Sequence, residues 1–443
     1  MARPQVVVFT RDLRVRDHPA LYAAARAGPV VPLFVVDPAV LGSPLVAEAR
    51  RAYLAAALAH LDAGLRRRGG LLVVHRGAWV DEVVAVVRHV DATVVHLARD
   101  HSPLARRRRR ALRARLASRD VTLRTWDHLT VVPPGALAPT GGDHFRVFTP
   151  YFRRWRAAPW RPVLPAPRTL RVPPLPEPDD PDPLLGMLPP PGAAPARLPG
   201  GEDEARARLR VFLARGLARY AETRDRFDGH PGSGLSADLH FGCLSPLEVA
   251  ARATAHPAGE AFVRQLCWRD FFAQVLAARP EAAWSELRGP TPAWRGEGAE
   301  VAAWRDGRTG VPLVDAAMRQ LRTEAFMPNR ARLVTASFLT RTLGVDWRLG
   351  ARHFLAHLVD GDVASNNLSW QWVAGTGTDT NPYRTFSPRR QAERFDPEGA
   401  YVRRWVPELA DLRPPELWDP PPLERARRGY PPPVGPVTPR PRR

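Results

Sequence analysis

The sequence predicts an α/β plus all-α fold: an N-terminal domain with a doubly wound parallel sheet, a long Pro-rich connector and a C-terminal helical domain. Three observations predict it. Short β-branched runs alternate with helical stretches over residues 1–130, prolines crowd together over 131–203, and apolar residues at three and four spacing follow over 204–412. The tail, 413–443, is rich in Pro and Arg, and we expect an irregular, basic end.

In the first domain, strands and helices alternate. The expected strands are Val6–Phe9, Val30–Val36, Leu71–His75, Thr93–Leu97 and Val121–Thr125, and the expected helices are Ala20–Ala27, Arg50–Arg68, Val80–Val90 and Leu104–Arg119. Nearly continuous apolar strands between helices indicate a parallel sheet, which binds ligands at the carboxyl ends of its strands. The first strand is followed by Thr10-Arg11-Asp12-Leu13-Arg14, with neither GxGxxG nor a P-loop. We therefore expect no dinucleotide bound in the Rossmann manner.

Proline at the density found in the connector blocks helices and central strands. The aromatic-rich stretch Phe145–Trp160 interrupts it and predicts a short helix packed against a domain. Beyond the connector, apolar spacing predicts helices over Ala205–Tyr220, Gly259–Ala278, Val311–Thr323 and Arg330–Leu343.

Composition bounds the function. The 443 residues carry a net charge of +20, from 65 basic against 45 acidic residues, and every basic residue counted there is Arg. Such a surplus favours a polyanionic partner, nucleic acid first and an anionic membrane second. We find neither a signal peptide nor an apolar run long enough to span a membrane, and expect a cytoplasmic protein. The two cysteines, Cys243 and Cys267, suggest buried thiols, and we expect no metal site.

Three motifs suggest chemistry. Eight of the thirteen tryptophans lie between Trp268 and Trp405, which suits a helical core, and as a group also suits stacking on bases or on a flavin. The segment 360–372 combines Asp-Gly-Asp with Asn and Trp, and favours a binding pocket over a metal site or a plain turn. The pentapeptide 232–236, GSGLS, is either a phosphate-binding loop or an ordinary one. The run Arg106–Arg110 is typical of a solvated helix face.

Long segments of the chain resemble the photolyase/cryptochrome family. They include VVVFTRDLRVRDHPALYAA, RDRFDGHPGSGLSADLHFGCLSP, FVRQLCWRDFF, TGVPLVDAAMRQL, NRARLVTASFL, LVDGDVASNNLSWQWVAGTGTD and FDPEGAYVRRWVPEL. The resemblance runs in order from residue 6 to about 410, and it is nearest to the bacterial enzymes that repair cyclobutane pyrimidine dimers. It implies an N-terminal antenna domain and a C-terminal helical domain that binds FAD.

The resemblance implies an FAD site with an ion pair, Arg332 with Asp360, beside the flavin ring. Asn366 matches the position facing flavin N5, where an amide favours repair and an aspartate would favour a signalling photoreceptor. The other implied FAD-binding residues are Tyr220, Gly232, Ser233, Gly234, Leu235, Ser236, Arg269, Gly361 and Asp362. Trp370, Trp347 and Trp304 match a chain of tryptophans that leads from the flavin to the surface.

For DNA, the resemblance implies contacts to a flipped-out lesion and to the backbone. These fall on Arg224, Gln265, Trp268, Asn329, Arg330 and Gln391. Several positions depart from the family pattern. Gln265 replaces a glutamate, Pro328 a histidine, Phe326 a tryptophan, Leu333 a methionine, Gly232 a threonine and Gly234 a bulkier residue. The histidines used on (6-4) photoproducts are not seen near Phe326–Arg332, so cyclobutane dimers are the favoured substrate.

Three functions remain open on these residues. The first is a dimer photolyase acting as a monomer on ultraviolet-damaged DNA. The second is a cryptochrome-like FAD photoreceptor without repair, for which the departures at Gln265, Pro328 and Leu333 speak. The third is a basic nucleic-acid-binding protein that has lost its flavin. The resemblance also implies a pocket near Arg99-Asp100-His101-Ser102-Pro103 that holds an antenna pigment, deazaflavin or methenyltetrahydrofolate, or that is empty.

Overall fold

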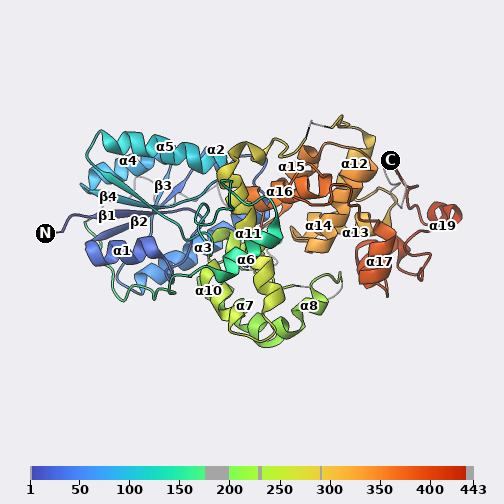
Figure 1. Cartoon of the computed structure of the whole chain (residues 1–443), viewed down its shortest axis with the longest axis horizontal. Helices are drawn as coiled ribbons and strands as arrows, with labels where there is room; N and C mark the ends of the chain where they lie inside the picture. The colour runs from blue at the N-terminus through green and yellow to red at the C-terminus, as the bar shows by residue number, and fades with distance from the viewer. Residues whose placement is uncertain (1, 175–198, 228–231, 290–291, 436–443) are drawn as a thin grey trace. The chain divides into compact units, whose positions relative to one another are not determined.

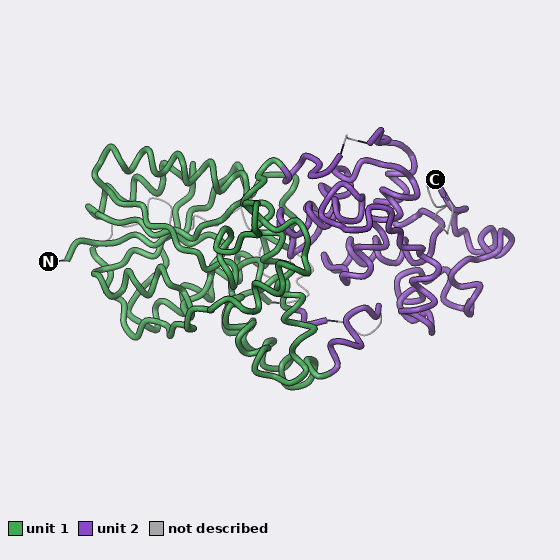
Figure 2. Tube along the Cα trace, viewed as in Figure 1, with its two compact units in different colours: residues 1–218, 235–281 green, residues 219–234, 282–443 purple. Residues whose placement is uncertain are grey.

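A computed structural model describes residues 2–174, 199–227, 232–289 and 292–435. The chain divides into two compact units, residues 1–218 with 235–281, and residues 219–234 with 282–443 (Figure 2). The chain enters the second unit briefly before it returns to the first. These units cross the domain boundaries expected from the sequence, which remain predictions.

The first unit is built on a five-stranded parallel sheet in the order β3-β2-β1-β4-β5. The strands are β1 Gln5–Phe9, β2 Val30–Val36, β3 Val73–Arg76, β4 Val94–Ala98 and β5 Thr122–Trp126. Val6 pairs with Val31 on one side and with Val95 on the other, and all three are fully buried. The predicted doubly wound parallel sheet is confirmed, with strand ends shifted by one or two residues.

Helices cover both faces of this sheet (Figure 1). The helices of the first unit are α1 Pro19–Ala27, α2 Pro38–Leu41, α3 Glu48–Arg66, α4 Trp79–His89, α5 Pro103–Ala117, α6 Phe148–Ala157, α7 Glu202–Val211, α9 Ser236–Phe241, α10 Pro246–Thr254 and α11 Glu260–Ala278. Trp79 and Val83 of α4 and Leu112 of α5 pack with the strand valines in one apolar core. The order of the strands reverses between β1 and β4, which is where such sheets hold ligands.

The second unit is helical. Its helices are α8 Tyr220–Thr223, α12 Ala299–Asp306, α13 Pro312–Glu324, α14 Asn329–Ser337, α15 Trp347–His357, α16 Val363–Ala374, α17 Pro388–Phe395, α18 Ala400–Trp405 and α19 Pro422–Arg427. The apolar faces of α12 to α18 share one core that contains Trp304, Trp347 and Trp370. The tryptophan-rich region therefore does form a helical core. Within the described residues, no helix has both the length and the apolarity needed to cross a bilayer.

Two of the expected helices are not continuous α-helices. The stretch Ala205–Tyr220 is α7 followed by a π turn, Phe212–Gly216, and a 3₁₀ turn, Leu217–Arg219. Gly216 is a poor helix former and marks this break. The stretch Arg330–Leu343 is α14 followed by a π turn, Phe338–Thr342, and Gly344 follows it with φ +69°. Apolar spacing alone does not separate these turns from an α-helix.

The described part of the connector is better ordered than its proline content suggests. Its helix α6, which was expected, buries Phe148, Tyr151, Phe152 and Trp155 in the first unit. Beyond it, the extended chain is tied to the same unit, because Leu170 donates its N–H to the Arg68 carbonyl over 2.7 Å. The most Pro-rich part of the connector lies outside the described residues.

The tail differs from the irregular end that we expected. It forms α19, and its side chains close the core of the second unit: Leu417 is fully buried and Tyr430 nearly so. The Tyr430 hydroxyl donates to Asp315 over 2.6 Å, and the buried Arg425 donates to the Gly310 carbonyl over 2.6 Å. Buried aromatic surface and satisfied polar groups explain why this segment is ordered despite its prolines.

Candidate functional site

A buried ion pair in the second unit joins two of the predicted site residues. Arg332, on α14, donates from Nη2 to Asp360 Oδ2 over 2.8 Å, and its Nε donates to the Met327 carbonyl over 2.9 Å. The Asp360 side chain is 4% exposed and that of Arg332 is 24% exposed. A buried charge pair of this kind is costly unless further polar groups complete it. The pair therefore suits a polar ligand edge beside it.

The residues after Asp360 place an amide at the start of a helix. Gly361 is buried, and Asp362 caps α16 by accepting the Ser365 N–H over 2.8 Å. Asn366, one turn later, donates from Nδ2 to the Ala351 carbonyl over 3.0 Å and to Asn367 Oδ1 over 2.9 Å. Both N–H groups of the amide are thus used inside the protein. Its oxygen is the atom that remains for a ligand, and it is an acceptor.

The predicted phosphate loop has a backbone that favours glycine. Gly232 has φ +104° and Gly234 has φ +68°, and a Cβ added at either position would meet no atom within 4 Å among the described residues. Both departures from the family pattern thus fall where the left-handed backbone disfavours larger side chains. In the next stretch, Leu235 is fully buried, and Ser236, which is exposed, begins α9.

Tyr220, the first residue of α8, is buried. Burial raises the pKa of its hydroxyl to about 12, so the group stays protonated and can donate a hydrogen bond at neutral pH. It shares the second unit with Asp360 and Asn366.

Among the three tryptophans of the predicted chain, we expected Trp304 at the end that reaches the surface, but the structure buries it. It is fully buried, donates its N–H to the Thr335 carbonyl over 3.1 Å, and packs on Trp370 with ring centroids 6.0 Å apart. Trp370 and Trp347 are also buried. Trp370 presses on α15 at Gly350, where an added Cβ would lie 2.1 Å from the indole ring. The helix that carries Trp347 is therefore in direct contact with Trp370.

Sequence reasoning missed Trp294 and Glu286. Trp294 is only partly buried, and its Nε1 donates to Glu286 Oε1 over 3.1 Å. Trp347 Nε1 donates to the same oxygen over 3.3 Å. The two indoles are thus joined by one carboxylate, which makes Trp294 a better candidate for the surface end than Trp304. Tryptophan density pointed to this region, but nothing in the residue spacing indicates which indole reaches water.

Three predicted DNA-binding residues form one connected polar group with the Asp225 carboxylate in the second unit. Arg330 Nη2 lies 2.8 Å from Asp225 Oδ1 and its Nη1 donates to Gln391 Oε1 over 3.4 Å. Arg224 Nε lies 3.9 Å from Asp225 Oδ2. Asn329 is exposed at the start of α14, directly before Arg330. The grouping agrees with a shared polar surface.

The remaining predicted residues lie on α11 in the first unit. Trp268 stacks on Phe148 with ring centroids 3.8 Å apart and planes inclined by 1°, and Gln265 is half-buried one turn earlier. Arg269 donates to the Leu129 and Leu239 carbonyls. These bonds tie α11 to two neighbouring segments and present Trp268 as a rigid aromatic wall.

At the carboxyl ends of β1 and β4, Arg11 Nη1 lies 3.2 Å from Asp100 Oδ2. His101 follows, and burial lowers its pKa to about 4, so its ring is neutral at pH 7. The expected pigment region is thus polar and partly buried.

A second group in this unit has the composition of a metal site. Asp12 Oδ2 lies 2.9 Å from His18 Nε2 and 3.0 Å from His128 Nε2, and all three side chains are buried. However, His18 Nδ1 accepts the Leu21 N–H over 3.0 Å as the cap of α1. The ring's proton then belongs on Nε2, the atom that a metal would need. The geometry favours a hydrogen-bonded cluster around Asp12.

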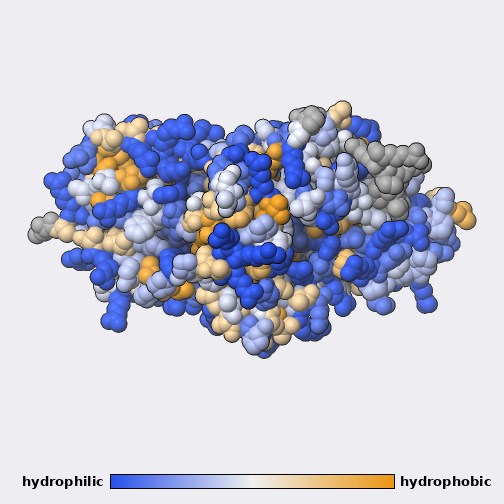
Figure 3. All heavy atoms as spheres, in the orientation of Figure 1, coloured by the Kyte–Doolittle hydropathy of each residue, from blue (hydrophilic) through white to orange (hydrophobic). Residues whose placement is uncertain are grey.

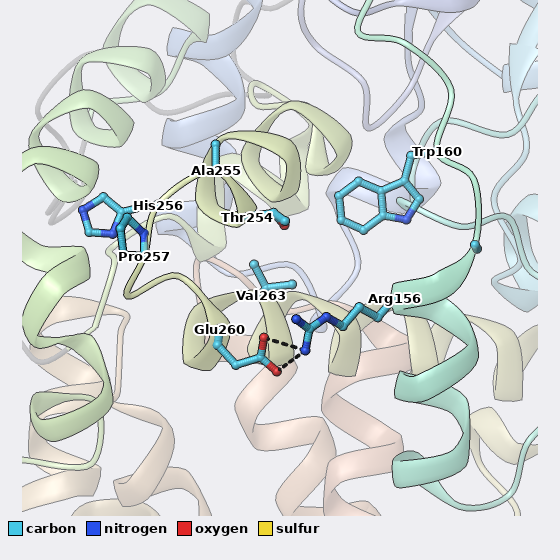
Figure 4. Close-up of a pocket in the computed structure, with 9 residues that line it drawn as sticks. Arg156, Trp160, Thr254, Ala255, His256, Pro257, Glu260 and Val263 are labelled. Atoms are coloured by element: carbon cyan, nitrogen blue, oxygen red, sulfur yellow. Dashed lines mark hydrogen bonds and ion pairs between the residues drawn. The ribbon is translucent and has the colours of Figure 1, made fainter.

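A pocket on the first unit is separate from all of these residues (Figure 4). It is lined by Trp160, His256 and an ion pair, in which Arg156 Nη1 lies 3.0 Å from Glu260 Oε2. None of the predicted site residues lines it.

The visible face of the molecule is mostly hydrophilic with scattered apolar patches (Figure 3). Cys243 and Cys267 are buried free thiols, as expected.

Comparison with known proteins defines the class. Residues 5–178 match the family model described as DNA photolyase, and residues 262–437 match the model described as the FAD binding domain of DNA photolyase. The chain is 50% identical to a deoxyribodipyrimidine photo-lyase of Streptomyces griseus, over 97% of this chain and 95% of that protein. It is 39% identical to an enzyme of the same name from Thermus thermophilus, over 96% of this chain and 97% of that protein.

Solved structures agree with this. A class III photolyase from Agrobacterium tumefaciens superposes with a TM-score of 0.89 and 32% identity, over 100% of this chain and 94% of that one. A cryptochrome from Synechocystis gives a TM-score of 0.90 and 27% identity, over 98% and 97%. The fold and the site thus define a flavin-binding protein whose reaction is driven by light. The chain belongs to the DNA photolyase family and carries its FAD-binding domain.

The described residues fit the flavin. The Asn366 oxygen offers an acceptor, the Arg332–Asp360 pair offers charged polar groups, and the loop at Gly232 and Gly234 has open space over its backbone. Acceptors, charges and open backbone are what a ring with N–H groups and a pyrophosphate require. The roles of the individual residues toward FAD remain predictions.

Proposed function

We propose that this chain repairs cyclobutane pyrimidine dimers in DNA, driven by blue light. The observation that carries the proposal is the amide of Asn366, whose N–H groups are satisfied by Ala351 and Asn367 and whose oxygen is left as an acceptor. An acceptor without an acidic proton cannot protonate the flavin, so it suits a flavin kept reduced and anionic. The 50% identity to an enzyme named for this reaction supports it.

When bound, reduced FAD would supply the light-excited electron that opens the dimer, and it would receive that electron back afterwards. Arg332, Asp360 and Asp362 would orient the ring, and Tyr220 and the loop Gly232–Ser236 would hold the rest of the cofactor. No general acid or nucleophile from the chain is needed, since the reaction breaks only bonds made by ultraviolet light. The protein's task is to bind, orient and exclude water.

The damaged bases would be held by residues from α11. Trp268, fixed against Phe148, offers an apolar wall for the two linked pyrimidines of a dimer taken out of the stack, and Gln265 offers an uncharged amide to their polar edge. A dimer stacks poorly, so flipping it out costs less than flipping an intact base. Arg224, Asn329, Arg330 and Gln391 would contact the phosphate backbone, to which the surplus of Arg draws the protein.

A light-harvesting pigment, deazaflavin or methenyltetrahydrofolate, would bind at the carboxyl ends of β1 and β4, near Arg11, Asp100 and His101. One solved relative, the photolyase from Sulfolobus tokodaii, is described as holding two FAD molecules, with the implication of a novel light-harvesting cofactor. A flavin is therefore a third candidate pigment to test. We further infer that the protein acts as a monomer in the cytoplasm.

The test is a repair assay on purified, photoreduced holoenzyme. An oligothymidine with cyclobutane dimers is illuminated with blue light, and the recovery of thymine absorbance is followed beside a dark control. Light-dependent recovery supports the proposal. A holoenzyme with reduced FAD that gives no recovery contradicts it, and a photoreceptor without repair becomes the better interpretation.

A further inference from the structure

Glu286 lies between two indoles of the second unit. Its Oε1 accepts the Trp347 Nε1–H over 3.3 Å and the Trp294 Nε1–H over 3.1 Å. An indole has a single N–H donor, so one carboxylate oxygen holds both rings by their only hydrogen-bonding atom. Trp347 is fully buried, whereas Trp294 is only partly buried. The carboxylate therefore joins an inner indole to an outer one.

The Glu286 carboxylate is buried and ionised. Its side chain is 6% exposed, and its second oxygen is paired with Arg348. Burial opposes the charge, but the hydrogen bonds from Arg348, from the residue's own backbone and from Trp294 outweigh it and lower the pKa of Glu286 to about 2. The group thus holds the two indole protons by hydrogen bonds and does not take them.

The charges around the two indoles are unequal. The Arg348 guanidinium lies over the Trp347 ring, 4.9 Å from its centroid, and it is paired with both Glu286 and Asp346. Arg295, next to Trp294 in the chain, is instead paired with Glu300. Glu286 bonds both indoles and favours a positive charge on either ring, whereas Arg348 opposes a positive charge at Trp347 alone. The field favours a positive charge at the outer indole.

We propose that Glu286 is a positioning residue that holds Trp347 and Trp294 together and stabilises the oxidising equivalent once it has moved outward from Trp347 to Trp294. The proposal rests on the proposed function, whose photoreduction step supplies the oxidant, the light-excited oxidised flavin of the holoenzyme. One electron leaves Trp294 and fills the vacancy on Trp347, so the positive charge lost by Trp347 appears on Trp294. An added thiol then returns an electron to Trp294. No bond forms or breaks, and the indole protons stay in their hydrogen bonds.

The test is transient absorption of tryptophan radicals in the oxidised holoenzyme. Glu286→Gln keeps an acceptor oxygen and removes the charge, and we expect the radical to live about tenfold less long, as for the loss of one hydrogen bond to a charged group. Glu286→Asp restores the charge and should recover part of the lifetime. Asp346→Asn is the matched control, because Asp346 also pairs with Arg348 but does not contact either indole hydrogen. It should change the lifetime much less than Glu286→Gln does.

Repair by chemically reduced holoenzyme separates the possible failures, since it bypasses the tryptophans. We expect all variants to repair as the parent does. If the parent repairs nothing or forms no tryptophan radical, the proposed function or its photoreduction step fails. If the parent forms the radical and Glu286→Gln has the same lifetime, or if it loses repair even when chemically reduced, the role of Glu286 is overturned. If Glu286→Gln does not hold flavin, an unchanged lifetime in Glu286→Asp overturns it instead.

Discussion

Single side chains decide the chemistry of this site. At Asn366 the two N–H groups bond to the protein, so the amide offers only its oxygen, and an aspartate could not reproduce that arrangement while ionised. At position 265 an amide stands where the family has an acid. We expect the first choice to favour a reduced flavin and the second to weaken the hold on the lesion. Both expectations can be tested one residue at a time.

Gln265→Glu should strengthen the hold on the dimer. A hydrogen bond to a charged group contributes about 1 kcal/mol more than a neutral one, which corresponds to roughly fivefold in affinity. The measurement is the dissociation constant for a dimer-containing oligonucleotide, with an undamaged one of the same sequence as control. Equal or weaker binding by the variant would argue that Gln265 does not contact the lesion.

Asp360→Asn should destabilise the protein and lower its flavin content. It leaves Arg332 partly buried without its charge partner, at a cost of about 3 kcal/mol. The readouts are the free energy of unfolding and the flavin absorbance per protein. Glu393→Gln, in the half-exposed pair with Arg389, is the control and should cost at most about 0.5 kcal/mol. Similar effects of the two substitutions would show that the Asp360 pair is not special.

The motifs predicted the region in which most candidate residues lie, but they did not predict how deeply each residue is buried. Arg332 pairs with Asp360, as expected, because both lie in long matched segments. The surface end of the tryptophan chain was placed at Trp304, which is fully buried, and Trp294 was overlooked. Whether an indole reaches water depends on packing from distant elements, and the local spacing of residues does not record that.

Among the elements, α11 is anchored through a buried acid next to the residues that should face DNA. Asp270 Oδ2 accepts the N–H groups of Val131 and Val132, over 2.8 and 3.0 Å, and the Trp155 indole N–H over 2.8 Å. One carboxylate thus fixes the start of the connector and α6 to α11. The orientation of Trp268 and Gln265 depends on this attachment.

The Asp270 anchor should make stability depend on pH. Burial raises its pKa from 3.8 to about 6, so the folded state holds the proton more tightly than the unfolded state. The stabilisation by protonated Asp270 is therefore complete below about pH 4 and is lost as the pH rises through about 6. This loss lowers the free energy of unfolding by about 3 kcal/mol. Asp270→Asn should remove this change. The measurement is the melting temperature from pH 4 to 8, and parallel curves for parent and variant would contradict the assignment.

The contact between α15 and α16 has no spare room at Gly350. An added Cβ would overlap the Trp370 ring, so Gly350→Ala should cost about 2 kcal/mol of stability despite the better helix propensity of Ala. Gly64→Ala on α3 is the matched control, because its added Cβ would lie 3.7 Å from the nearest atom, and it should gain up to about 1 kcal/mol. Urea unfolding of both variants measures this. Equal effects would mean that Trp370 can move aside.

Elements were predictable where one periodicity ran unbroken. The five strands and α11 were expected within one or two residues, since each is an uninterrupted apolar pattern. The π turns at Phe212–Gly216 and Phe338–Thr342 were not expected, because each interrupts the α-helical spacing for only five residues. The order of the tail was missed for a different reason: its partners, Asp315 and Gly310, lie about a hundred residues earlier in the chain.

For the whole molecule, the surplus of positive charge should govern nonspecific binding. Proteins that neutralise six to ten phosphates lose about 10³–10⁵ in affinity between 50 and 200 mM salt. With a net charge of +20, we expect a loss of at least about 10³ for undamaged duplex DNA over that range. Fluorescence anisotropy of a labelled duplex at several salt concentrations measures it. A shallow dependence would mean that most of the arginines serve internal ion pairs.

The contact between Tyr430 and Asp315 has a genetic consequence. A premature stop codon near residue 412 would remove only about a fourteenth of the chain, and no residue assigned to flavin or DNA would be lost. Yet the carboxylate of Asp315 would lose the phenol that caps it, and the hollow now filled by Leu417 and Tyr430 would open to water. Such a truncated allele would be expected to behave as a loss of function through misfolding, with every chemical group of the site still encoded.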